Sequence, residues 1–201
     1  MIDFDGVIAD SLETFFPTFT ELCTEMGFDR MNSRESFLKL FEANNLLQEL
    51  VRKGFPVWRL KKLLKALEPR VAALNKTVPA FAGMPALLCD LAAAHPSYVV
   101  TSNMSATVEA FLERYGVGGI RDVLGVDKDR SKVKKIRALM KAHPGCEAYY
   151  IGDTKGDMLE ARKAKCVAVA AAWGWHSVET LREGGPDHVL HSPAELRALL
   201  L

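Results

Sequence analysis

Apolar positions follow two different patterns along the chain. Between about residues 11 and 75 they recur every three or four residues, which predicts helices over 11–26 and 56–75 and one or two helices over 33–53. The first helix should open with a capping box, in which Asp10 or Ser11 is the cap and Glu13 reaches back. No strand pattern interrupts residues 10–77, so we expect an all-helical insert of roughly 70 residues that forms its own module.

From Met84 onward, helix patterns alternate with strand patterns. Such alternation predicts an α/β fold in which helices cover both faces of a parallel sheet. Residues 79–83 read as the linker that returns the chain from the insert. We expect helices over 84–94, 105–115, 131–143, 156–164 and 193–200, and strands over 98–101, 122–126, 148–151, 166–170 and 188–190.

At the N-terminus, a short apolar lead meets two carboxylates in the stretch Asp3-Phe4-Asp5-Gly6. Residues i and i+2 of a strand point the same way, so Asp3 and Asp5 can share one face where the strand ends. Gly6 permits a sharp backbone turn there. Two neighbouring carboxylates repel each other unless a proton or a cation lies between them, which indicates a hard cation such as magnesium. The alternative is a strand followed by an ordinary polar turn.

Other polar residues follow the later strands. Thr101-Ser102-Asn103 comes after one strand, Gly152-Asp153 with Asp157 comes after another, and Lys132 opens a helix. Taken singly, these are ordinary caps, turns and solvated side chains. Because ligands bind at the carboxyl ends of parallel strands, we expect all of them to converge on one rim.

Composition excludes several classes of protein. The 201 residues are 49% hydrophobic and 25% charged, as in a globular protein with a sizeable core. A net charge of +1 argues against a broad nucleic-acid or membrane surface. The chain shows neither a membrane span nor a signal peptide, and its four scattered cysteines are typical of reduced thiols, so we expect a cytoplasmic protein.

In their order along the chain, Asp3-Phe4-Asp5-Gly6, Thr101, Lys132 and Gly152-Asp153 with Asp157 resemble the four motifs of the haloacid dehalogenase-like hydrolases. The phosphoglycolate phosphatase-like branch with a helical cap is the most similar. The resemblance implies a Rossmann-like core over residues 1–10 and 83–201, with a cap domain inserted over residues 11–82. The family usually has more residues before its first motif, so we expect either an unusually short first strand or a shortened N-terminus.

The resemblance also implies roles for these residues. Asp3 would be the nucleophile and Asp5 the general acid and base. Phosphate would be bound by Thr101, Ser102, Asn103 and Lys132. Mg²⁺ would be held by Asp3, Asp153 and the backbone carbonyl of Asp5, with Asp157 acting directly or through water. Lys128, Lys134 and Lys135 are alternatives to Lys132, which is preferred because it opens the helix before the fourth motif.

The carboxylate of Asp5 favours phosphatase over dehalogenase chemistry, because the dehalogenases of the family lack an acid two residues after the nucleophile. Residues 11–19 contain no histidine of the sort found in sugar-phosphate mutases, so hydrolysis of a small phosphorylated metabolite is expected over transfer. A mutase and a non-catalytic binding module remain alternatives, and the protein is expected to be a monomer or a homodimer.

Two weaker features remain open. Eight basic residues against one acid in 52–76 form either a surface that attracts anionic substrates or a solvated helix face. The segment Trp173-Gly174-Trp175-His176 either lines the rim of the site or packs at the edge of the core.

Overall fold

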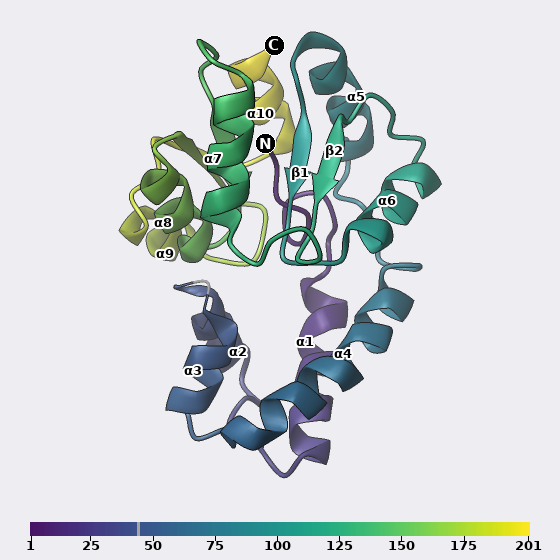
Figure 1. Ribbon diagram of the computed structural model, residues 1–201, viewed down its shortest axis with the longest axis vertical. Coiled ribbons are helices and arrows are strands. Elements are labelled where there is room, and N and C mark those ends of the chain that lie inside the picture. The colour runs from purple at the N-terminus through teal and green to yellow at the C-terminus, as the bar shows by residue number, and fades with distance from the viewer. Residues whose placement is uncertain (44) are drawn as a thin grey trace.

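A parallel sheet forms the centre of the upper lobe in the computed structural model, which describes residues 1–43 and 45–201 (Figure 1). β1 pairs with β2, and β4 pairs with both β3 and β5, all in parallel. Ile2 forms parallel bridges to Val99 and Ile151 and so joins the two groups of strands. The strands are β1 (Tyr98–Val100), β2 (Asp122–Leu124), β3 (Tyr149–Gly152), β4 (Val167–Ala171) and β5 (His188–Leu190).

The N-terminal segment is the middle of this sheet although it is very short. The amide of Ile2 donates to the carbonyl of Tyr98, and the amide of Asp3 donates to the carbonyl of Ile151, both at 2.9 Å. These bonds on both sides align the segment with β1 and β3. Asp3 therefore lies at the carboxyl end of the sheet, beside the residues that follow β1 and β3.

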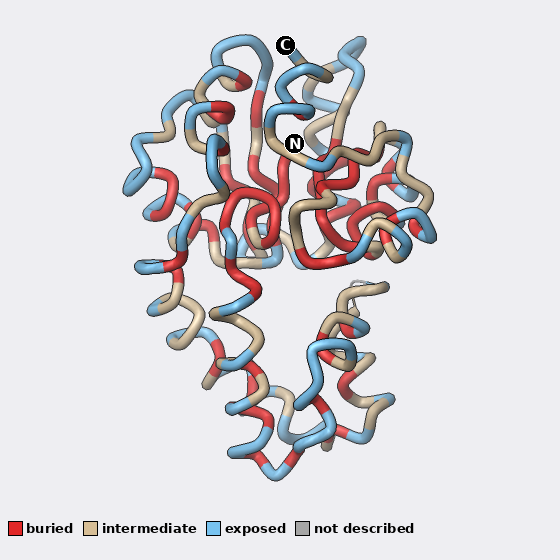
Figure 2. The backbone as a smooth tube through the Cα atoms, turned by 180° about the vertical axis from the view of Figure 1, so that it is seen from behind, coloured by how far each residue is buried: buried red, intermediate tan, exposed pale blue. Residues whose placement is uncertain are grey.

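Six helices cover the sheet, three on each face. Successive strand residues alternate between two cores, so Val99 packs with α5, α6 and α10 while Val100 packs with α7, α8 and α9. Figure 2 shows the buried residues concentrated at the centre of this lobe. The α/β fold with a helix-covered parallel sheet is thus confirmed. The helices are α5 (Met84–Ala94), α6 (Ser105–Arg114), α7 (Lys132–Ala142), α8 (Lys155–Ala164), α9 (Val178–Glu183) and α10 (Pro193–Leu200).

In the described residues of the lower lobe in Figure 1 the regular elements are all helices, and the core of this lobe is rich in aromatic side chains. Asn44, which falls within the predicted helical stretch 33–53, lies outside the described residues. None of the helices in the described part of the chain is long and apolar enough to cross a membrane. The elements of this helical lobe are α1 (Leu12–Glu25), α2 (Arg34–Leu38), η1 (Lys39–Phe41), α3 (Leu46–Arg52), η2 (Val57–Arg59) and α4 (Leu60–Leu74).

Two antiparallel segments connect the lobes. Ala9 forms an antiparallel bridge to Ala80, the amide of Asp10 donates to the carbonyl of Pro79, and the amide of Phe81 donates to the carbonyl of Ile8. The exit from the sheet and the return from the helical lobe therefore lie side by side, directly after Asp3 and Asp5.

The predicted capping box at α1 is wrong. Ser11 is the N-cap residue, but its side chain makes no capping hydrogen bond. The capping box forms instead at α8, where Thr154 and Asp157 satisfy each other's backbone amides. Ser11 has helical backbone angles, which place its hydroxyl badly for capping, whereas Thr154 is extended, as capping requires. The pattern also missed the short helix α9.

Substitution of Phe37 tests how much aromatic packing stabilises the helical lobe. Its ring is fully buried and lies 5.1 to 5.8 Å from the rings of five aromatic residues, namely Phe15, Phe16, Phe19, Phe41 and Trp175. We expect Phe37→Ala to lower the free energy of unfolding by about 3–5 kcal/mol, because the surrounding rings cannot close the cavity that loss of the Phe37 ring leaves. Urea unfolding measures this loss. Trp58→Ala, at a side chain that is 81% exposed, should change it by less than about 0.5 kcal/mol, and equal losses would contradict the packing role.

Candidate active site

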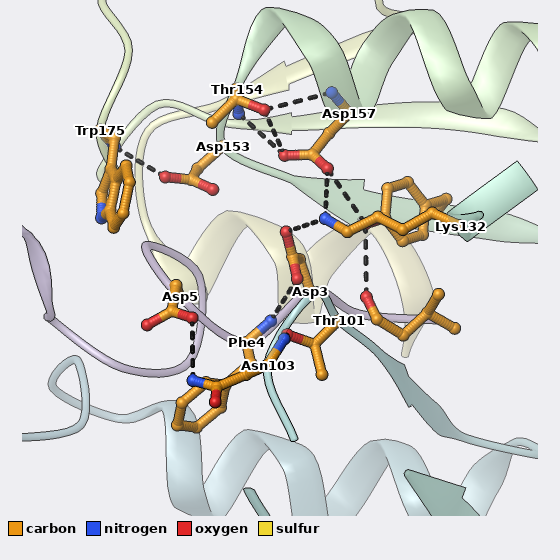
Figure 3. Close-up of polar contacts among 12 residues, drawn as sticks. Asp3, Phe4, Asp5, Thr101, Asn103, Lys132, Asp153, Thr154, Asp157 and Trp175 are labelled. Atoms are coloured by element: carbon orange, nitrogen blue, oxygen red, sulfur yellow. Dashed lines mark hydrogen bonds and ion pairs between the residues drawn. The ribbon is translucent and has the colours of Figure 1, made fainter. Parts of the chain in front are cut away.

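The structure brings the predicted polar residues to one rim of the sheet (Figure 3). Asp3 follows the central segment, Thr101 follows β1, Asp153 follows β3 and Lys132 is the first residue of α7. All four side chains are buried. The carboxyl ends of neighbouring parallel strands meet at one edge, which is why residues 150 positions apart become neighbours.

The ammonium group of Lys132 links two of the carboxylates. Its Nζ lies 2.5 Å from Oδ2 of Asp3 and 2.7 Å from Oδ1 of Asp157. Burial disfavours the charged lysine, but Asp157 and Asp3 outweigh it and hold the pKa of Lys132 well above its usual value. Lys132 is therefore a fixed positive charge beside Asp3.

Asp157 is held by several donors at the start of α8. Its Oδ2 accepts from the amide and the hydroxyl of Thr154, and its Oδ1 accepts from the hydroxyl of Tyr150 at 3.1 Å as well as from Lys132. Burial would raise the pKa of Asp157, but Lys132 and these hydrogen bonds lower it instead. Asp157 is thus ionised and keeps Lys132 in place.

The pKa values of Asp3 and Asp153 are raised, whereas that of Asp157 is lowered. Burial raises the pKa of Asp3 to about 7 despite Lys132, and burial together with the charges of Asp157 and Asp3 raises the pKa of Asp153 well above normal. Oxygen atoms of Asp3, Asp153 and Asp157 all lie within 4.8 Å of one another. Repelling carboxylates gathered in this way fit a hard divalent cation, whose charge would relieve the repulsion.

Two glycines allow the chain to pass close to Asp153. A Cβ atom built on Gly6, whose φ is +73°, would lie 1.8 Å from Oδ2 of Asp153, and one on Gly174 would lie 2.3 Å from its Cβ. No side chain fits at either position. Oδ2 of Asp153 also accepts from the amide of Trp175 at 2.8 Å, so the loop after β4 orients this carboxylate.

Asp5 lies apart from these three carboxylates. Nδ2 of Asn103 donates to its Oδ2 at 3.3 Å. Burial raises the pKa of Asp5, although Ser11 and Asn103 oppose the shift. The side chain of Asp5 does not belong to the acidic cluster found among the described residues, and metal binding through its backbone carbonyl stays a prediction.

The segment 101–103, directly after β1, carries three polar side chains that differ in burial. Oγ1 of Thr101 accepts from the amide of Asn103 at 3.0 Å, which folds the segment into a tight turn. Thr101 is buried, Asn103 is partly buried and Ser102 is exposed. Whether these residues bind phosphate stays a prediction.

The alternative lysines lie elsewhere. Lys128 pairs with Asp122 on the surface and Lys134 is exposed. Nζ of Lys135 is buried and donates to the carbonyls of Thr101 at 2.7 Å and Gly125 at 3.0 Å. Burial, with the nearby charge of Lys132, lowers the pKa of Lys135 to about 8. Lys132 is therefore the lysine that contacts Asp3, and Lys135 ties the end of β1 to the residue after β2.

Sequence reasoning missed the supporting roles of Thr154, Tyr150 and Lys135. For Thr154 a signal was available, because Thr154 three residues before Asp157 matches a capping box. Tyr150 and Lys135 gave no such signal, since a tyrosine in a strand and a lysine in a helix are ordinary.

The side chains of residues 173–176 pack in different parts of the molecule. Nε1 of Trp173 donates to the carbonyl of Val7 and its ring packs against the core. Trp175 instead packs among the aromatic residues of the helical lobe. Nδ1 of His176 accepts from the amide of Lys155 at 3.0 Å, so Nε2 carries the proton and donates to the carbonyl of Leu38 in the helical lobe.

The chain is similar to curated phosphoglycolate phosphatases, to one over nearly its whole length and to another over about half of it. A phosphoglycolate phosphatase from Synechococcus elongatus is 25% identical over 98% of this chain and 93% of its own length. A phosphoglycolate phosphatase from Vibrio parahaemolyticus is 32% identical over 49% of this chain and 46% of its own.

Solved structures share the fold. A haloacid dehalogenase-like family hydrolase from Streptococcus pneumoniae superposes with a TM-score of 0.82 at 20% identity, covering 100% of this chain and 96% of that one. A hydrolase from Pseudomonas syringae gives 0.79 at 22% identity, covering 99% and 95%.

The family model for haloacid dehalogenase-like hydrolases matches residues 1–171, which include every motif residue described above. The chain therefore belongs to the haloacid dehalogenase-like hydrolase family.

Proposed function

We propose that this protein is a magnesium-dependent phosphatase that hydrolyses a small phosphate monoester through an aspartyl phosphate on Asp3. The observation that carries the proposal is a buried Asp3 carboxylate held by Lys132, with Asp153 close by and Asp5 two residues further on. Family membership and the phosphatases among the relatives support it.

The charges of the site fit a dianionic substrate only with a cation present. Mg²⁺ would be held by Asp3, Asp153 and the backbone carbonyl of Asp5, with Asp157 supporting it, and would supply positive charge to the phosphoryl oxygens. Lys132 contributes a fixed positive charge of the chain itself, and the hydroxyl of Thr101 with the polar groups of Ser102 and Asn103 provides further donors. Phosphoryl transfer depends mainly on such positioning and charge.

The carboxylate of Asp3 attacks phosphorus, and the bond from phosphorus to the leaving oxygen breaks. The amide of Phe4 donates to Oδ1 of Asp3 at 2.8 Å, and Lys132 holds Oδ2, so the nucleophile cannot rotate away. Asp5 gives its proton to the leaving alkoxide and later takes one from the water that attacks the aspartyl phosphate. The raised pKa of Asp5, caused by burial, favours the protonated form that the first step needs. Inorganic phosphate and free Asp3 result.

The helical lobe would act as a cap domain over residues 11–82, opening and closing on a core of residues 1–10 and 83–201. The paired linkers at Ala9 and Ala80 leave the core right beside Asp5, which suits a hinge at the site. His176 and Trp175 join the two lobes in the present arrangement. Closure would exclude bulk water during the attack by Asp3.

Asp3→Asn tests the nucleophile. We expect phosphate release from p-nitrophenyl phosphate and small phosphomonoesters to fall by about 10³-fold or more, because an amide cannot form the covalent intermediate. Asp10→Asn, at an exposed acid on the same segment, should retain wild-type rates. Magnesium should be required and a chelator should abolish turnover. Activity that survives in folded Asp3→Asn would sink the mechanism.

Asp5→Asn tests the acid. A p-nitrophenolate leaves without help from a proton, whereas an alkoxide does not. We therefore expect Asp5→Asn to slow an alkyl phosphate by about 10²–10⁴-fold and p-nitrophenyl phosphate much less in the first step, which the burst phase reports. Equal slowing of both bursts would argue that Asp5 does not protonate the leaving group.

Asp153→Asn tests the cation site through stability. The pKa of Asp153 is raised in the folded state, so its ionised form destabilises the metal-free fold above pH ~4. With chelator at pH 7.5, Asp153→Asn should melt at least ~2 °C above the wild type, because the cost of burying the Asp153 carboxyl and its repulsion by Asp157 and Asp3 are removed. Magnesium should raise the Tm of the wild type and of the control Asp29→Asn but leave Asp153→Asn unchanged. A magnesium shift that persists in Asp153→Asn would contradict the site.

A further inference from the structure

The side chain of Trp175 lies between the acidic site and the helical lobe. Its backbone amide donates to Oδ2 of Asp153, while its indole stacks on Phe15 at 5.8 Å and meets the edge of Phe41 at 5.0 Å. The residue is 8% exposed. One residue thus contacts both a predicted metal ligand and the aromatic core of the helical lobe.

The indole N–H of Trp175 is buried and has no acceptor among the described residues. The other two indoles differ, since Nε1 of Trp173 donates to the carbonyl of Val7 at 3.2 Å and Trp58 is 81% exposed to solvent. Buried donors are almost always paired, because an unpaired one loses its hydrogen bonds to water without replacement. The exception at Trp175 needs an explanation.

The indole of Trp175 lies against the segment that carries Asp5. A Cβ atom built on Gly6 would lie 2.7 Å from Cδ1 of Trp175, the ring carbon bonded to Nε1. Gly6 directly follows Asp5, the residue that would protonate the leaving oxygen. Figure 3 shows the indole on the side of the site occupied by Asp5 and Asp153, away from Lys132.

We propose that Nε1–H of Trp175 donates a hydrogen bond to an oxygen atom of the leaving group, and that it selects small esters that carry such an oxygen. The inference rests on the proposed phosphatase function. A hydroxyl or a carboxylate oxygen would satisfy the donor, whereas an alkyl group would leave it unpaired. Phe15 and Phe41 pack against the same indole and hold it in place.

Trp175→Phe separates the hydrogen bond from the packing. Phenylalanine keeps an aromatic ring in the cluster and the backbone amide on Asp153, but it has no N–H. The substrates are three two-carbon esters, namely ethyl phosphate, 2-hydroxyethyl phosphate and phosphoglycolate, assayed with magnesium. We expect the kcat/KM of the wild type to be higher for one or both oxygen-bearing esters than for ethyl phosphate. Trp175→Phe should lower the ratio of these two kcat/KM values about 10-fold, mainly by raising the KM for the oxygen-bearing ester. The two oxygen-bearing esters distinguish hydroxyl from carboxylate.

Trp58→Phe is the matched control and should leave both ratios unchanged. Circular dichroism should show that substrate-free Trp175→Phe stays folded, although the smaller ring leaves a cavity in the aromatic core that lowers its thermal stability. Ratios in Trp175→Phe equal to those of the wild type would overturn the inference while leaving the phosphatase intact. Wild-type protein that hydrolyses none of these esters, nor p-nitrophenyl phosphate, would contradict the proposed function and this inference with it.

Discussion

The rest of the site depends on how buried carboxylates share positive charge. Asp3, Asp153 and Asp157 are gathered within 4.8 Å, and the ammonium of Lys132 reaches Asp3 and Asp157. Asp157 is stabilised as an anion and its pKa falls, whereas burial and repulsion raise the pKa of Asp153. This imbalance defines a place for added positive charge on the side of Asp153, and it costs stability that the surrounding fold must supply.

The fold supplies that support through short, well-connected backbone segments. Ile2 bridges both halves of the sheet, and its bonds place Asp3 at the carboxyl edge. The capping box of α8 holds Asp157, and the close approach at Gly6 and Gly174 leaves Asp153 no room to move. Each carboxylate is thus fixed by backbone geometry as well as by charge, which suits chemistry that depends on positioning.

The same loops connect the site to the helical lobe. Asp5 directly precedes the paired linkers, and the segment after β4 carries both the amide that orients Asp153 and the indole that packs against Phe15. A change in the position of the helical lobe would therefore act on the polar groups around Asp3. Trp175 makes this connection with a side chain that the sequence alone gave no reason to choose over Trp173.

The sequence by itself determined the α/β class and predicted that Asp3, Thr101 and Asp153 follow strands, because apolar periodicity is a local signal. Tertiary structure decided which lysine contacts Asp3. Lys132 and Lys135 lie on the same helix, and what distinguishes them is the distant group that each one contacts. It also moved the expected capping box from Ser11 to Thr154 and divided the two tryptophans between the lobes. Burial and long-range contacts set these outcomes, and neither can be read from neighbouring residues.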